Sequence, residues 1–419
     1  MYKLHKKLLF FLFICKCGRC FKMITYRSLN LGTETAFSVL AKANKLAEQG
    51  KEIINLGIGQ PDFLTPEHIV EAGIKALRDG HHGYTQASGI PKLREAVCSD
   101  IFRRHNVEIS PENILIVPGG KVIIFFSSML LGDHDREILY PNPGFPIYES
   151  AIRFSGAKPV PYRLKENIGF SFSADDILNK LTKKTSLIII NSPSNPTGGI
   201  IPKEEIDKLI VGLENHPNTM LMSDEIYDQF CFGETRFTSL LNYPSIRDRL
   251  IILNGWSKTY AMTGWRLGYG VFPDTLIDAA DKLAVNVHSC VNASAQYAAL
   301  EALNGPQEFI AEHNIKFLQR RDLVVSKLNS IDGIQCRIPD GAFYVYPSCN
   351  GIIGRKTNEG KEIKTDEDFM NYLLDSEGVA GVHGEAFGLS PYFRLSYATS
   401  EEILKDACSR IERACKKLR

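Results

Sequence analysis

The chain has 419 residues, with 44% hydrophobic and 23% charged side chains and a formal net charge of +1. This nearly neutral balance excludes a strongly basic surface for nucleic acid and an acidic solvating tail, while the length allows two domains with buried cores. The ten cysteines show no framework spacing, which favours reduced thiols in a cytoplasmic protein.

The N-terminus begins with a basic and then apolar segment. Lys6 and Lys7 precede the apolar residues 8–15, a run too short to span a bilayer, and no small-residue cleavage site follows. A metal site built on the cysteines of residues 15–20 would lack a fourth ligand, so we predict no metal. Because Met23 is an equally good start, we expect residues 1–22 to be a dispensable extension outside the fold. A targeting role is the alternative.

Residues 33–50 have the pattern of an amphipathic helix that ends at Gly50. From about residue 110, short apolar runs alternate with helix-like segments such as residues 202–216. The apolar runs are "NILIV" (113–117), "EILY" (137–140), "SLIIIN" (186–191), "TMLMSD" (219–224), "LIILN" (250–254) and "LGYGVF" (267–272). Nearly continuous apolar runs of this length are typical of buried parallel strands. We therefore predict an α/β protein whose mostly parallel sheet carries helices on both faces.

The pattern changes after about residue 305, where a charged helical stretch leads into a separate α+β region. The helix predicted within residues 33–50 has no sheet of its own, so we expect it to pack against that region. The sequence therefore predicts a large domain over residues 57–304 and a smaller domain formed by residues 23–56 and 305–419.

Five of the predicted strands are followed by residues that suit a ligand site. In a parallel sheet the carboxyl ends of the strands lie at one edge, where ligands bind. Each residue also has a simpler explanation, such as a tight turn, a proline turn, a helix N-cap or core packing. Their joint occurrence favours one shared crevice lined by Gly120, Phe145, Asn195, Asp224 and Lys258.

Four residues have the chemistry of a phosphate site. Gly120 and Lys121 begin a predicted helix whose N–H groups can bind an anion. Ser257 and Arg266 add a hydroxyl group and a guanidinium group. The alternative for Arg266 is an ordinary surface cation.

The remaining residues suit an aromatic ring that carries an aldehyde. A pyridine ring needs a flat apolar partner, for which Phe145 is suited, and a carboxylate at its nitrogen, for which Asp224 is suited. Asn195 and Tyr227 can donate to a phenolic oxygen, and the amine of Lys258 can condense with an aldehyde. These requirements are those of pyridoxal 5'-phosphate, whose electron-sink chemistry depends on a carboxylate beside the ring nitrogen.

From about residue 23 to the C-terminus, the sequence resembles the class I/II aminotransferases of fold type I, in the subgroup of bacterial aspartate aminotransferases. The resemblance implies a transaminase with pyridoxal phosphate as its cofactor. It rests on eight motifs in the family's order: "GQPDF", "YTQASGIPKLRE", "PGGK", "NSPSNPTGG", "SDEIY", "SKTYAMTGWRLGY", "GAFYVYPS" and "FRLSYATSEE".

The resemblance also implies catalytic and cofactor-binding roles. Lys258 would form the Schiff base with the cofactor and transfer the substrate proton, and Asp224 would pair with the ring nitrogen. Asn195 and Tyr227 would bind the ring oxygen, and Phe145 would stack on the ring. The phosphate would be held by the residues named above for that site.

Three further positions acquire roles from the resemblance. Gly59 and Asn195 would line the substrate site, and Arg394 would bind the substrate carboxylate with both of its terminal nitrogens. Tyr84 would reach the phosphate site of a neighbouring subunit, so the active unit would be a homodimer.

We predict that the substrates are aspartate or glutamate and a 2-oxo acid such as 2-oxoglutarate. Lys121 would bind the distal carboxylate of such a substrate. Alternatively, Lys121 only neutralises phosphate charge or points to solvent. We expect small-molecule partners, with no nucleic acid and no membrane partner.

Two departures from the family pattern leave other functions open. Many aspartate-specific relatives have tryptophan where this chain has Phe145, and Trp256 is bulkier than the residue usual at its position. Aminotransferases for aromatic or other apolar amino acids, and a pyridoxal-phosphate-dependent β-lyase on the same fold, are therefore alternatives. A non-enzymatic binding protein is disfavoured, because the full set of catalytic positions is present.

Overall fold

The computed structural model describes residues 24–29, 31–232 and 236–419. The predicted extension, residues 1–22, lies outside the described residues, and its dispensability stays a prediction. Among the described helices, none combines the length and the hydrophobicity that crossing a bilayer requires. The described cysteines are all unpaired thiols.

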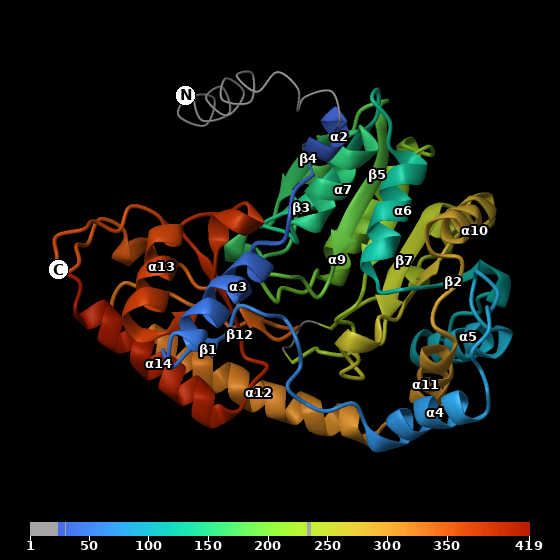
Figure 1. Ribbon diagram of the computed structural model, residues 1–419. Helices are drawn as coiled ribbons and strands as arrows, with labels where there is room; N and C mark the ends of the chain where they lie inside the picture. The colour runs from blue at the N-terminus through green and yellow to red at the C-terminus, as the bar shows by residue number, and fades with distance from the viewer. Residues whose placement is uncertain (1–23, 30, 233–235) are drawn as a thin grey trace.

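The centre of the molecule is a seven-stranded sheet with the strand order β2-β8-β7-β6-β5-β3-β4 (Figure 1). All its strands are parallel except β8, which runs antiparallel to both β7 and β2. The strands are β2 (Ile114–Val117), β3 (Glu137–Asn142), β4 (Lys158–Arg163), β5 (Thr185–Asn191), β6 (Met220–Asp224), β7 (Leu250–Gly255) and β8 (Gly268–Val271).

The six predicted apolar runs are all strands, which confirms the α/β prediction. Of the six, β8 is the antiparallel member, which agrees with the predicted mostly parallel sheet. The chain between β7 and β8 contains a short 3₁₀ helix, Thr263–Trp265, and no α-helix that could cross back over the sheet. Strand β4 is not among the predicted strands. Its "KPVPYR" segment contains two prolines, which are tolerated because β4 is an edge strand.

Helices cover both faces of this sheet, as alternate residues of β2 demonstrate. Ile114 and Ile116 belong to one buried cluster, with α5 (Pro91–His105), α9 (Lys203–Gly212) and α11 (Ala293–Asn304). Leu115 and Val117 belong to another, with the helices α6 (Lys121–Leu131), α7 (Ile147–Ser155) and α10 (Asp274–His288). Burial on both faces explains why the strands read as continuous apolar runs. Two further helices of this part are α4 (Glu67–Arg78) and α8 (Ala174–Leu178).

The C-terminal part has its own hydrophobic core and smaller sheets. Its helices are α12 (Glu308–Asn329), α13 (Asp366–Glu377) and α14 (Glu401–Lys416). An antiparallel sheet has the order β11-β12-β9, formed by β11 (Val382–His383), β12 (Phe393–Ser396) and β9 (Tyr344–Val345).

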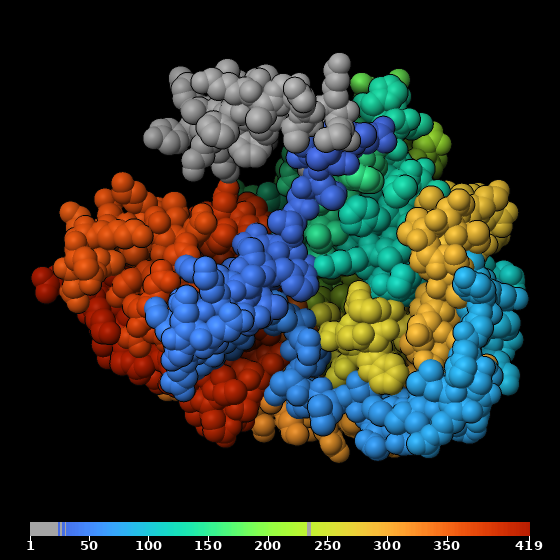
Figure 2. All heavy atoms as spheres, viewed as in Figure 1, coloured from blue at the N-terminus to red at the C-terminus, as the bar shows by residue number. Residues whose placement is uncertain are grey.

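The N-terminal segment packs against this C-terminal part. A short helix α2 (Tyr26–Leu29) precedes α3 (Thr35–Glu48), and β1 (Ile54–Asn55) pairs in parallel with β10 (Val379–Ala380). Figure 2 shows this blue segment lying between the red and orange C-terminal part and the green and teal part of the molecule. Residues from three distant regions of the sequence therefore meet where the segment crosses.

Candidate active site

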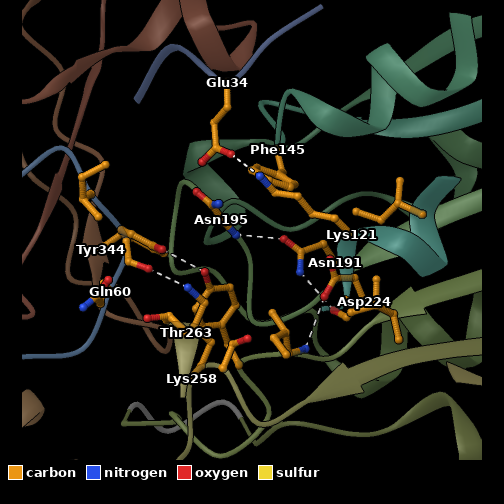
Figure 3. Close-up of a pocket in the computed structure, with 18 of the residues that line it drawn as sticks. Glu34, Gln60, Lys121, Phe145, Asn191, Asn195, Asp224, Lys258, Thr263 and Tyr344 are labelled. Atoms are coloured by element: carbon orange, nitrogen blue, oxygen red, sulfur yellow. Dashed lines mark hydrogen bonds and ion pairs between the residues drawn. The ribbon is translucent and has the colours of Figure 1, made fainter. Parts of the chain in front are cut away.

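A cavity of about 460 Å³ lies at the carboxyl edge of the large sheet, beside the N-terminal segment and the C-terminal part (Figure 3). Eleven of the twelve predicted site residues line it; Tyr84 does not. The eleven predicted residues that line the cavity are Gly59, Gly120, Lys121, Phe145, Asn195, Asp224, Tyr227, Ser257, Lys258, Arg266 and Arg394. The residues that follow parallel strands meet for the reason given above, since the carboxyl ends of these strands share one edge, whereas Gly59 comes from the N-terminal segment and Arg394 from β12.

One end of the cavity is suited to a phosphate. Helix α6 begins directly after Gly120 at this end of the site; the N–H groups of Val122 and Ile123 already donate to the carbonyls of Gly119 and Gly120, which leaves those of Gly120 and Lys121 for an anion. Gly119 has a φ of +95°, and an added Cβ there would collide with the guanidinium of Arg266. Arg266 donates to the carbonyl of Thr263 at 2.7 Å and forms no ion pair with any described residue. With the buried hydroxyl of Ser257, this arrangement offers donors and positive charge to an anion.

The amine of Lys258 lies in the cavity and donates to the carbonyl of Gly59 at 2.5 Å. Burial lowers the pKa of Lys258 from 10.5 to about 8. Glu34 opposes this shift, whereas the cations Arg394 and Lys121 add to it. A larger share of neutral amine is thus present near neutral pH than for an ordinary lysine, which suits a nucleophile or a proton acceptor.

Asp224 presents a buried carboxylate at the end of β6. Burial raises the pKa of Asp224 to about 6, although the hydroxyl of Tyr148 donates to Oδ2 at 2.7 Å and the N–H of Ile226 donates to Oδ1 at 3.3 Å. Among the described residues it forms no ion pair. A buried carboxylate without a cation fits a ligand that brings a protonated ring nitrogen.

The other side of the site is built from tyrosine and asparagine side chains. The hydroxyls of Tyr227 and Tyr344 are 2.8 Å apart and hydrogen-bonded. Asn191 accepts from the N–H of Asn195 at 2.9 Å and donates to the carbonyl of Asp224 at 3.0 Å. One amide side chain therefore fixes the loop of Asn195 against the strand end that carries Asp224.

Arg394, on β12, is a buried cation that is 2% exposed. Its terminal nitrogens donate to Oδ1 of Asn195 at 2.7 Å and to the carbonyl of Gly57 at 2.6 Å. Its Nε has no hydrogen-bond partner, and no described residue forms an ion pair with it. An uncompensated buried charge is costly, so this guanidinium is poised for a carboxylate.

Close packing explains one glycine in this region. A Cβ added at Gly59 would collide with the hydroxyl group of Tyr344. The backbone therefore passes close to the tyrosine ring, and the carbonyl of Gly59 can accept the bond from Lys258.

Two residues that were singled out in the sequence do not line the cavity. Tyr84 is 92% exposed and lies outside the cavity of its own chain. Trp256, which was expected to affect the substrate, is buried against Tyr269 and does not line the cavity. The residue following β7 points into the core while Ser257 and Lys258 reach the site, so Trp256 does not line the space that a substrate would occupy.

The cavity is also lined by residues that were not predicted from the sequence. Tyr148 follows Phe145 by three residues, a helical spacing that could have indicated its position at the start of α7. Tyr344 and Asn191 lie within motifs already quoted above. Glu34 forms an ion pair with Lys121 at 2.5 Å, and no local pattern in the sequence signals that contact.

The mostly parallel sheet, with a lysine and an aspartate at its carboxyl edge and an anion-binding helix terminus, is the architecture of pyridoxal-phosphate-dependent enzymes of fold type I. Residues 51–411 match the model of the aminotransferase class I and II family. The chain belongs to this family. It is a transaminase, moving an amino group between an amino acid and a 2-oxo acid, and pyridoxal phosphate is its cofactor.

The chain is similar in sequence to known aminotransferases over nearly its full length. An aspartate/prephenate aminotransferase of Cereibacter sphaeroides is 41% identical over 90% of this chain and 95% of its own. An aspartate aminotransferase of Rhizobium meliloti is 39% identical, covering 94% of this chain and 96% of its own. A crystal structure of the aspartate aminotransferase from Rhizobium meliloti superimposes with a TM-score of 0.91 at 38% identity, covering 95% and 100% of the two chains.

Proposed function

We propose that this transaminase acts on aspartate or glutamate, with a 2-oxo acid such as 2-oxoglutarate as the amino acceptor. The buried guanidinium of Arg394, which forms no ion pair with a described residue, carries the part of the proposal that concerns the substrate α-carboxylate, since it needs an anion and lines the same cavity as Lys258. An α-carboxylate satisfies this need with two parallel charge-assisted bonds. The names of the two relatives reported above support the choice of aspartate.

The cofactor residues are proposed from the same geometry. When bound, pyridoxal phosphate supplies an aldehyde for the amino group and a ring that accepts electrons from the substrate carbon. Asp224 would hold a proton on the ring nitrogen, Asn195 and Tyr227 would donate to the ring oxygen, and Phe145 would cover the ring. The phosphate would be held by the N-terminus of α6 at Gly120, with Ser257 and Arg266.

Lys258 is the residue that we propose to move the substrate proton. Its lowered pKa makes the neutral amine available as a base, and the carbonyl of Gly59 orients its nitrogen. Arg394 would anchor the carboxylate, so that the carbon–hydrogen bond to be broken is held near this amine. Gly59 and Asn195 would complete the substrate site.

We further propose a homodimer in which Tyr84 serves the neighbouring site. Tyr84, Leu64 and Phe37 are large apolar or aromatic side chains that are 92%, 88% and 56% exposed. Exposed groups of this kind are typical of a surface that a partner covers. The predicted division into a large domain, residues 57–304, and a small one, residues 23–56 and 305–419, belongs to the same proposal, as does a cytoplasmic location.

An aminotransferase for aromatic or other apolar amino acids is the second candidate. Two observations favour it: Phe145 lines the cavity, and the charge of Lys121 is already opposed by Glu34. The β-lyase alternative has no contact in its favour.

A coupled assay tests the proposal. Purified protein with pyridoxal phosphate, L-aspartate and 2-oxoglutarate should form oxaloacetate, measured through malate dehydrogenase and NADH. Replacing the proton-transfer group, as in Lys258→Ala, should lower turnover by at least about a thousandfold. Cofactor retention and a cooperative melt establish that the variant is folded. Substantial activity in that variant would remove Lys258 from the mechanism, and ammonia and pyruvate released from a β-substituted substrate would indicate a lyase.

A further inference from the structure

The ion pair of Glu34 and Lys121 lies inside the cavity of the candidate active site. Glu34 Oε2 and Lys121 Nζ are 2.5 Å apart, and both residues line the cavity with Lys258 and Arg394. Figure 3 shows the carboxylate reaching toward the lysine beside Phe145, with Lys258 on the opposite side in this view. An acidic side chain is thus placed where a substrate with an acidic side chain would have to enter.

Local structure leaves the carboxylate of Glu34 free for this contact. Glu34 is the residue that precedes the first turn of α3, yet its side chain makes no capping hydrogen bond to the helix. It points away from α3 into the cavity, from the N-terminal segment that crosses between the two halves of the molecule (Figure 2). Its side chain is only 18% exposed, whereas that of Lys121 is 42% exposed.

The ammonium of Lys121 is surrounded on several sides. It lies 5.4 Å from the ring centre of Phe37 and 5.3 Å from that of Phe145, in addition to its contact with Glu34. Among the described residues that line the cavity, Glu34 and Asp224 are the acidic ones, and Asp224 lies at the cofactor end. Glu34 is therefore the acid that a second substrate carboxylate would meet at Lys121.

We infer that Glu34 determines specificity by occupying, in the free enzyme, the position that the distal carboxylate of a dicarboxylic substrate needs at Lys121. The inference rests on the proposed function, in which Arg394 binds the α-carboxylate. A dicarboxylic substrate binds at Lys121 only by displacing Glu34. An amino acid with an uncharged side chain leaves the ion pair in place and packs against Phe37 and Phe145.

The displacement weakens the binding of dicarboxylates relative to monocarboxylates. A second carboxylate next to an unmoved Glu34 meets a like charge, and a displaced Glu34 loses its own ion pair. A partly exposed pair of this kind changes an equilibrium by about two- to fivefold. A site with Lys121 alone would prefer aspartate and glutamate over neutral amino acids. Glu34 therefore makes this preference smaller.

The test is binding of succinate and propionate to the holoenzyme, measured by calorimetry, for wild type and Glu34→Gln. The glutamine keeps the shape and removes the charge. We expect the variant to bind succinate about two- to fivefold more tightly than wild type, and the ratio of kcat/KM for aspartate over alanine to rise by a similar factor. Equal changes for succinate and propionate, or weaker succinate binding, would overturn the inference.

Two further variants isolate the contact. Glu48→Gln removes the same charge from the exposed end of α3 and should leave the binding of succinate as it is in wild type. In a Lys121→Gln background, Glu34→Gln should tighten succinate less than it does in wild type, because the part of the effect that acts through Lys121 is lost and only the like-charge repulsion is relieved. If Glu34→Gln melts early, Glu34→Ala is measured in its place. An unaltered gain in the Lys121→Gln background would refute the displacement.

These results separate the inference from the proposed function. Failure of wild type to transaminate any amino donor refutes the proposed function, while the binding of succinate is measured without turnover. Use of aspartate by Glu34→Gln but not by wild type would support the inference and refute the proposed substrate of the natural enzyme.

Discussion

Replacing Arg394 by lysine keeps a positive charge on β12 but removes the planar fork of donors. A guanidinium has five N–H groups, and the structure uses two of its nitrogens for Asn195 and Gly57. An ammonium has three N–H groups on one atom. Lysine can thus retain these neighbours or reach the substrate, but it cannot offer two parallel bonds to a carboxylate.

The magnitude follows from the loss of one charge-assisted bond. Such a bond contributes about 1.5–3 kcal/mol, which corresponds to a rise of roughly 10- to 150-fold in KM. A ligand present at a hundred times its Kd stabilises the folded state by about 2.7 kcal/mol, and a hundredfold weaker Kd leaves about 0.4 kcal/mol of this. The thermal shift produced by 2-oxoglutarate should therefore almost disappear in Arg394→Lys.

The coupled assay and thermal melts with and without 2-oxoglutarate measure both effects. Arg320→Lys is the matched control, since Arg320 is also buried but already forms two bonds with Asp62, at 2.7 and 2.9 Å. This control should lower the melting temperature without raising KM. An Arg394→Lys enzyme with the KM values and thermal shift of wild type would show that Arg394 does not bind the substrate carboxylate.

Two other changes test the cofactor residues. Burial raises the pKa of Asp224 from 3.8 to about 6, so its contribution to the stability of the cofactor-free protein is present below pH 3.8 and is lost as the pH rises through 6. Asp224→Asn should therefore stabilise the cofactor-free protein near pH 7 by on the order of 3 kcal/mol, measured by urea titration. The same substitution should lower the turnover of the holoenzyme. An apoprotein no more stable than wild type, or unchanged turnover, would contradict this assignment. Tyr84→Phe should weaken pyridoxal phosphate by about tenfold, and mixing it with Lys258→Ala should restore tight, active sites, because each hybrid dimer contains one complete site. Absence of restoration would place Tyr84 in its own chain or outside the site.

The strand ends were predictable because strands that are buried on both faces of the sheet have nearly continuous apolar sequences. The convergence of Gly120, Asn195, Asp224 and Lys258 then follows from the geometry of a parallel sheet. The direction of β8 was not predictable from its composition, since a buried antiparallel strand has the same apolar pattern.

Residues that reach the site from outside the sheet were harder to find. Arg394 was placed through family resemblance alone, as β12 belongs to a different sheet. Glu34 had no signal, because its contact with Lys121 joins residues far apart in the sequence through the path of the N-terminal segment. Tertiary contacts of this kind depend on how separate elements pack, which hydrophobic periodicity does not encode.

The pairing of β1 with β10 has a consequence for the order in which the protein matures on the ribosome. A nascent chain that has emerged to residue 304 contains every strand of the seven-stranded sheet, along with Asp224 and Lys258. It still lacks Arg394 and the strand that holds residues 54 and 55 in place. Chains emerge from their N-terminal end, so the residues proposed to hold the cofactor are synthesised before Arg394, the residue proposed to bind the substrate carboxylate. Until β10 has been synthesised, β1 has no strand with which to pair.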